Sequence, residues 1–339
     1  MKKRCSVLAV LGALVLPFLG ASDTSEQQEA IKRLELALSR TNILDLPSFQ
    51  MKASVLIDIQ GKPSEGSYQL LWNGLEQWRE EISLPGYTEI QVAGKETLWI
   101  QRSTDFIPLR IYQLHSALGF SSDAAGAEPG PTWSFTQLGL GPRGIVKNTR
   151  SRKEHGAKVT CVEIENELKR ESEMCVSDST GTLVRSSSYE DRDFQPVGGK
   201  VFPRLLSFVE NGRPVAKVNV SELLTPAQFG PNAFTPPSGA LQQPGCMNPV
   251  PPRPVKQENP KYPFGARERQ LQGTVSVDAQ IGLDGVPKIR KVVADPNPDL
   301  TKPSLDAIAG WRYEPATCNG KPVPIETVLQ VKYTLSVER

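Results

Sequence analysis

The sequence predicts an α+β protein in which a large, curved antiparallel sheet with a leading helix is joined by a proline-rich linker to a small three-stranded sheet with two helices. Three observations support this fold class. Residues 48–237 are dominated by runs of alternating apolar and polar residues separated by glycine-containing turns. Over residues 235–260 this periodicity stops and proline becomes frequent. Alternation then returns over residues 259–339, around one helical segment. A length of 339 residues suits two such units.

The N-terminus has the pattern of a secretory signal peptide. Basic residues at positions 2–4 precede an apolar run over residues 6–19, and small residues follow at positions 20–22. We expect residues 1–21 to be removed by cleavage near Ala21. The alternative is an uncleaved inner-membrane anchor, but the apolar run is short for a span and a proline interrupts it. Mass spectrometry of the mature N-terminus distinguishes the two.

The large unit, residues 22–237, begins with a helix. Residues 24–40 place Ile31, Leu34 and Leu38 on one face, with charged residues opposite. Strand signals follow, starting with the alternating segment "FQMKASVLIDIQG" and ending with a hairpin around Asn211-Gly212. A short helix is expected over residues 108–119. Roughly ten strands in a meander favour a strongly twisted antiparallel sheet, and we expect its concave face to be apolar.

Residues 238–258 form the predicted linker, which is partly polyproline II because its prolines exclude it from the middle of a sheet. The small unit, residues 259–339, is expected to run short helix, strand, strand, helix, strand. "GTVSVDAQIGLDG" alternates and ends in an Asp-Gly hairpin turn, "KPSLDAIAGW" is helical, and residues 327–337 form the last strand. The sequence order therefore predicts a helix packed on a three-stranded sheet.

This small unit resembles the C-terminal domain of the TonB energy-transducer family over nearly its whole length. The resemblance rests on "PKYPFGARERQLQGTVSVDAQIGLDGVP", on "LDAIAGWRYEPATCNGKPV" and on the long final strand. The positions that follow the family pattern are expected to be structural: Tyr262, Pro263, Gly273, Asp284, Gly285, Trp311, Pro315, Asn319 and Gly320. The resemblance implies that Trp311 fills the corner between the helix and the next strand.

The resemblance implies a function in binding. The family pairs its sheet edge with a strand of an outer-membrane transporter, so that backbone hydrogen bonds provide the affinity. The corresponding edge strand here contains Thr327, Leu329, Val331, Tyr333 and Leu335. One departure is plain, because a globular unit replaces the long spacer of a standard transducer. A linker of about 25 residues is too short to span a periplasm, which argues against force transduction.

Residues 48–237 resemble the LolA/LolB-like lipoprotein-carrier fold, an unclosed barrel, through "YQLLWNGLEQWREEI", "CVSDSTGTLVR" and the hairpin at residues 202–237. This implies a periplasmic protein with a lipid or acyl ligand in the large unit. Two functions follow: an adaptor for an outer-membrane transporter or other envelope protein, or a lipid carrier whose small unit is a docking module.

We expect neither catalytic activity nor binding of nucleic acid, a cofactor or a metal ion. A net charge of +2 does not suggest nucleic acid. No nucleophile elbow, zinc-protease motif, P-loop or dinucleotide fingerprint occurs in the sequence, so we expect neither an enzyme nor a cofactor. Only two histidines are present, His115 and His155, and no Cys-x-x-Cys pair accompanies them, so no metal site is expected either.

Four cysteines remain once Cys5 is removed with the signal peptide, and they allow three pairings in an exported protein. Symmetric pairing of "AKVTCVEIE" with "SEMCVSD" places Cys161 opposite Cys175. We expect Cys246 in the linker to pair with Cys318 beside the Asn319-Gly320 turn, closing a loop worth up to about 4 kcal/mol. The alternative is four free thiols in a reducing compartment.

Overall fold

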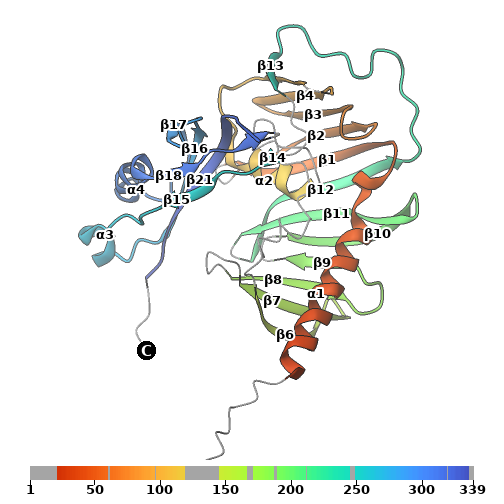
Figure 1. Cartoon of the computed structure of the whole chain (residues 1–339), viewed down its shortest axis with the longest axis horizontal. Helices are drawn as coiled ribbons and strands as arrows, with labels where there is room; N and C mark the ends of the chain where they lie inside the picture. Colours follow the sequence, from red (N-terminus) through yellow and green to blue (C-terminus); the bar gives the residue numbers. More distant parts are fainter. Residues whose placement is uncertain are drawn as a thin grey trace, which may run out of the picture.

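A computed structural model describes residues 21–59, 62–95, 97–118, 145–165, 171–186, 189–210, 212–244, 249–318 and 320–335. In these residues thirteen strands form one antiparallel sheet that does not close, with β13 and β6 at its edges (Figure 1). The strand order is β13-β5-β4-β3-β2-β1-β12-β11-β10-β9-β8-β7-β6. The bounds are β1 Phe49–Ile59, β2 Lys62–Trp72, β3 Trp78–Leu84, β4 Tyr87–Ala93, β5 Thr97–Arg102, β6 Ile145–Glu154, β7 Ala157–Glu165, β8 Glu171–Ser177, β9 Leu183–Ser186, β10 Tyr189–Val197, β11 Lys200–Glu210, β12 Arg213–Leu224 and β13 Leu241–Pro244.

Two helices cover the sheet. Helix α1 (Ala21–Thr41) buries Leu34 and Ala37 against Val162 and other residues of β6–β9. A short 3₁₀ turn (Ile43–Asp45) then leads into β1. Helix α2 (Leu109–Leu118) joins the apolar cluster of β1–β5 and β10–β12 through Ile111 and Leu114 and lies next to β1 and β11. Complete burial of a leucine contributes about 2 kcal/mol, so each helix is held by its apolar stripe.

The proline-rich linker is not a free tether. β13 extends the edge of the large sheet by pairing with β5, whereas β14 (Pro249–Val250) and β15 (Arg253–Lys256) pair with strands of the small unit. The sequence excluded this segment from the middle of a sheet but did not predict that parts of it would pair as edge strands. The physical reason is that all three strands lie at sheet edges, where a proline without an N–H group is tolerated.

The small unit has the predicted order, with strand order β17-β16-β21 and α4 packed on the sheet. Three short strands, unpredicted, lie between α4 and β21. The bounds are α3 Phe264–Glu268, β16 Gly273–Ile281, β17 Pro287–Ala294, α4 Pro298–Gly310, β18 Arg312–Glu314, β19 Thr317–Cys318, β20 Lys321–Pro322 and β21 Ile325–Tyr333. The fold class of the chain is therefore confirmed.

Most of the predicted structural positions have a visible role. Trp311 follows α4, is 2% exposed, and donates its indole N–H to the Glu258 carbonyl oxygen at 2.9 Å. Gly285 has φ +70°, and a Cβ there would lie 1.8 Å from the carbonyl oxygen of Tyr313. Asp284 stabilises the same turn because its side chain accepts the N–H of Val286.

The remaining structural positions are placed as follows. Tyr262 donates its hydroxyl to the Leu271 carbonyl oxygen, Pro263 precedes α3, and Gly273 begins β16 with φ +144°. Pro315 lies between β18 and β19, and Gly320 has φ +76°. Asn319 lies outside the described residues.

The first disulfide is confirmed. Cys161 and Cys175 are directly paired in the β7–β8 ladder, bonded to each other, with their Cα atoms 3.9 Å apart. Cys318 is also disulfide-bonded. Its predicted partner Cys246 lies outside the described residues, as does the signal peptide up to residue 20, so these two predictions stay open. Among the described helices, none combines the length and apolar character needed to cross a bilayer.

Candidate functional site

The predicted partner edge is β21. In the described residues β21 pairs only with β16, from Gly273↔Tyr333 to Ile281↔Ile325, and so forms an edge of its sheet. Leu329, Val331 and Tyr333 are buried in the core of the small unit. Thr327 and Leu335 are half-buried. What this edge offers a partner is therefore the backbone of the strand, together with the exposed side chains of Gln330 and Lys332.

The other face of the same small sheet contacts the large unit. Glu326 of β21 forms an ion pair with Arg102 of β5 at 2.8 Å and a second ion pair with Arg290 of β17. Arg290 continues to Asp278 at 2.8 Å, and the Asp278 side chain is fully buried. Burial raises the pKa of Asp278, although Arg290 works in the opposite direction. A chain of alternating charges thus joins the two units.

This chain begins at a polar centre inside the large unit. Arg102 Nε lies 2.9 Å from Oε2 of Glu89, and His115 of α2 places Nε2 3.2 Å from Oε1 of Glu89 and 3.5 Å from Oε2 of Glu80. Glu80, Glu89 and His115 are 2%, 1% and 0% exposed. The covered face of the large sheet is mostly apolar, as predicted, but these ionisable groups interrupt it beneath α2.

The two carboxyl groups of this centre have opposite pKa shifts. Burial acts to raise the pKa of Glu89, but the hydrogen bond and charge of His115, followed by Arg102, lower it to about 2. Burial, with the charge of Glu89, raises the pKa of Glu80 despite the opposing effect of His115. Tyr87 donates its hydroxyl to Glu89 at 2.8 Å, and Gln91 donates its amide to the same carboxylate at 2.8 Å. Glu89 therefore contacts Tyr87, Gln91, Arg102 and His115, more partners than any other residue named in this centre.

A groove of about 780 Å³ lies between the units. Its lining includes Phe106, Leu109 at the start of α2, and Val292 and Ala294 of β17. Lys291 places its ammonium 5.6 Å from the centre of the Phe106 ring. The groove combines apolar walls with a cation from the small unit.

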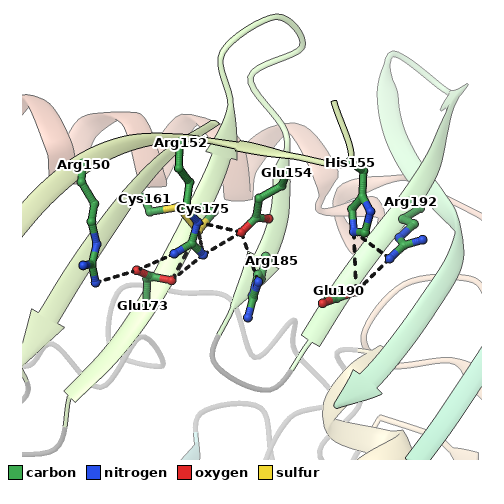
Figure 2. Close-up of polar contacts among 10 residues, drawn as sticks. All are labelled: Arg150, Arg152, Glu154, His155, Cys161, Glu173, Cys175, Arg185, Glu190 and Arg192. Atoms are coloured by element: carbon green, nitrogen blue, oxygen red, sulfur yellow. Dashed lines mark hydrogen bonds and ion pairs between the residues drawn. A yellow bond between two sulfur atoms is a disulfide. The ribbon is translucent and has the colours of Figure 1, made fainter. Parts of the chain in front are cut away.

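The sheet face opposite α1 carries a ladder of paired charges around the disulfide (Figure 2). Arg152 contacts Glu154 at 2.6 Å, Glu173 at 2.7 Å and the sulfur of Cys175 at 3.4 Å. The ladder continues with Arg150 against Glu173 and Arg185 against Glu154. Beside it, Glu190 contacts Arg192 and His155. Acidic and basic groups alternate, so we assign this face a stabilising role.

Sequence reasoning missed the Glu80–Glu89–His115 centre. The available signal was a disturbed alternation: Glu80 occupies an inward position between Trp78 and Ile82, and Glu89 occupies one after Tyr87. Both carboxyls stand where the pattern calls for apolar side chains. Their approach to His115 depends on the docking of α2, which periodicity does not describe.

Comparison with known proteins identifies the small unit. Residues 258–335 match the family described as Gram-negative bacterial TonB protein C-terminal, which confirms the resemblance of this unit. The match supports an association of the protein with the bacterial envelope. A comparison with curated proteins found no match.

Several solved structures are similar to parts of the chain. The C-terminal domain of TonB from Pseudomonas aeruginosa is 27% identical and covers 28% of this chain and 97% of its own, with a TM-score of 0.24. A LolA superfamily protein from Nitrosomonas europaea is 15% identical over 61% of this chain and 97% of its own, with a TM-score of 0.32. A DUF1329 family protein from Desulfovibrio piger is 12% identical over 60% and 96%, with a TM-score of 0.36.

Proposed function

We propose that the protein is a periplasmic, non-catalytic adaptor that engages an outer-membrane transporter or another envelope protein by β-strand addition at β21, in support of transport across the outer membrane. The observation that carries the proposal is the one-sided pairing of β21 within a unit that matches the TonB C-terminal family. An edge strand presents unpaired N–H and C=O groups, which are a template for an added strand.

The exposed part of β21 limits where the partner docks. Glu326 and Val328, near the start of the strand, are 12% and 7% exposed, and Glu326 contacts the large unit. Gln330, Lys332 and Thr334 are exposed. An incoming strand therefore pairs alongside residues 329–335, and the large unit holds the other end of β21 in place.

Photo-crosslinking in intact cells tests this docking. A photoreactive amino acid at Gln330 is expected to capture one envelope protein, whereas the same group at Lys288 captures none. Lys288 is a matched control, because it is exposed on β17, the opposite edge of the same sheet. Equal capture from both edges, or none from Gln330, contradicts strand addition at β21.

Proline substitution provides the second arm. Successive N–H groups of an edge strand point alternately toward its neighbour and away from it. Of Gln330→Pro and Val331→Pro, one therefore removes an outward donor and the other a ladder bond to β16. The variant that keeps the fold by circular dichroism is expected to lose the crosslink placed at Lys332. A crosslink that survives in that variant argues against backbone pairing.

The alternative function is a carrier of lipid or lipoprotein acyl chains, favoured by the groove of about 780 Å³ between the units. Its apolar walls suit a hydrocarbon chain, and Lys291 suits an anionic head group. A fluorescent fatty acid is expected to bind the full mature chain, and Leu109→Glu is expected to weaken this binding. Absence of saturable binding to the wild-type chain removes the carrier function and leaves the adaptor function untouched.

A further inference from the structure

The centre beneath α2 has the geometry of a ligand set as well as that of a hydrogen-bonded cluster. Glu80 is on β3, Glu89 on β4 and His115 on α2, and one ligand atom from each lies within 4.8 Å of the other two. The side chains converge from three elements and are almost completely buried. The other described cluster of this kind, Glu154 with Cys161 and Cys175, has its sulfurs in a disulfide and offers no thiolate.

The separations from His115 fit metal coordination as well as hydrogen bonding. Imidazole and carboxylate ligands bind Zn²⁺ at about 2.0–2.1 Å, which separates two ligands of a tetrahedral ion by roughly 3.3–3.4 Å. The two separations from Nε2 of His115 are 3.2 Å to Glu89 and 3.5 Å to Glu80. N–H···O hydrogen bonds typically span about 2.7–3.2 Å, so the contact with Glu89 also suits a hydrogen bond, whereas the contact with Glu80 is longer than usual for one.

A second observation points to a missing partner. In the described residues, the hydroxyl of Tyr68 and Oε1 of Glu80 are buried without a well-formed hydrogen bond, although the two side chains approach each other. Tyr68 is on β2, next to β3. Burial raises the pKa of its phenol, and the charge and hydrogen bonding of the nearby Glu80 carboxylate raise it further. Buried polar atoms without a partner are uncommon in folded proteins, because each costs about 1–3 kcal/mol.

The groups behind the ligand set also suit a metal centre. Tyr87 and Arg102 contact Oε2 of Glu89, and Gln91 contacts Oε1, so the carboxylate is oriented by three donors. Hydrogen bonds of this kind orient ligands in metal sites and are themselves important for affinity. The positive charge of Arg102 is offset by Glu326 across the domain interface. Two carboxylates with a divalent ion then leave the buried centre close to neutral.

We propose that Glu80, Glu89 and His115 bind a divalent transition-metal ion, with Zn²⁺ as the best fit, and that Tyr68 lies beside its fourth position. One imidazole and two carboxylates without sulfur favour Zn²⁺ over Cu⁺, and the imidazole disfavours Mg²⁺ and Ca²⁺. The ion joins α2 to β3 and β4. Because the ligands are buried, it enters as the large unit folds.

The test uses the mature full-length chain with its disulfides intact. The protein is unfolded in urea with a chelator, freed of both, and refolded with one equivalent of Zn²⁺ or Mg²⁺. We expect one Zn²⁺ per chain to remain after gel filtration and the melting temperature to rise, with neither effect from Mg²⁺. His115→Gln is expected to lose the bound ion, and Gln91→Leu to weaken the affinity about 10–100-fold.

His155→Gln is the matched control, because His155 is the other histidine of the chain and its imidazole is exposed. This variant is expected to bind Zn²⁺ like the wild type. X-ray absorption of the Zn²⁺-loaded His155→Gln chain is then expected to show one imidazole with oxygen ligands, a result that does not depend on the folding of His115→Gln. Wild-type chains refolded without bound Zn²⁺, or a spectrum without imidazole scattering, overturn the proposal.

Discussion

The ion pair between Arg102 and Glu326 is predicted to stabilise the docking of the small unit on the large one. The two residues are 224 positions apart in the sequence, and their side chains are only 10% and 12% exposed. Removing one partner of a buried ion pair costs about 3–5 kcal/mol. Each residue here keeps a second partner, Glu89 or Arg290, so we expect Arg102→Gln and Glu326→Gln each to cost about 2–3 kcal/mol.

A double-mutant cycle isolates the interaction itself. Urea unfolding of the wild type, both single variants and the double variant is expected to give a coupling energy of about 1–2 kcal/mol. Lys302 and Asp306 form the control pair, because their contact of the same length, 2.8 Å, joins side chains that are 83% and 67% exposed. That exposed helix pair is expected to give about 0.3–0.5 kcal/mol.

The outcome decides whether the domain contact is specific. A coupling energy for Arg102 and Glu326 that does not exceed the value of the control pair would refute the argument. The contact would then behave as a solvent-screened surface pair, and the series of ion pairs through Arg290, Glu326 and Arg102 would not hold the two units together. Hydrogen exchange in residues 325–333 provides an independent readout, because weaker docking lowers the protection of the start of β21.

Three further predictions concern stability and covalent structure. Gly285→Ala is expected to destabilise the small unit by more than about 3 kcal/mol in thermal unfolding, because the added Cβ collides with the backbone of Tyr313. Gly320→Ala is the control, because Gly320 also has a positive φ, +76°, but a Cβ there meets no neighbouring atom, and it should cost about 1–2 kcal/mol. Equal losses in the two variants would exclude the collision as the cause. Since the pKa of Glu89 falls from 4.5 to about 2 on folding, ionised Glu89 contributes up to about 3 kcal/mol to the free energy of unfolding above pH 4.5, and this contribution is lost as the pH falls toward 2. In urea unfolding of the metal-free protein at several pH values, Glu89→Gln should lack this part of the pH dependence. An unchanged dependence of stability on pH would contradict the assignment. Non-reducing peptide mapping is expected to recover a Cys246–Cys318 peptide, and a different partner for Cys246 would show that the linker is tied elsewhere.

Much of the architecture could be read from local patterns. The alternation in β1 and β16 predicted strands because side chains of an extended chain point to opposite faces in turn. The pairing of Cys161 with Cys175 followed from two adjacent strands whose register a short connection determines. The role of Trp311 was implied by the resemblance to the TonB C-terminal domain, and in the structure this residue follows α4 and is 2% exposed.

Other features depend on contacts between distant parts of the chain. The linker strands were missed because proline excludes central strands but allows edges, and only the packed units show that an edge is available. The centre of Glu80, Glu89 and His115 was missed for a related reason. A carboxylate at an inward position is costly by itself, and it becomes stable only when a helix from another part of the chain brings a polar partner, His115, beside it. Periodicity reports which face a residue occupies, and the folded chain alone decides which partners meet there.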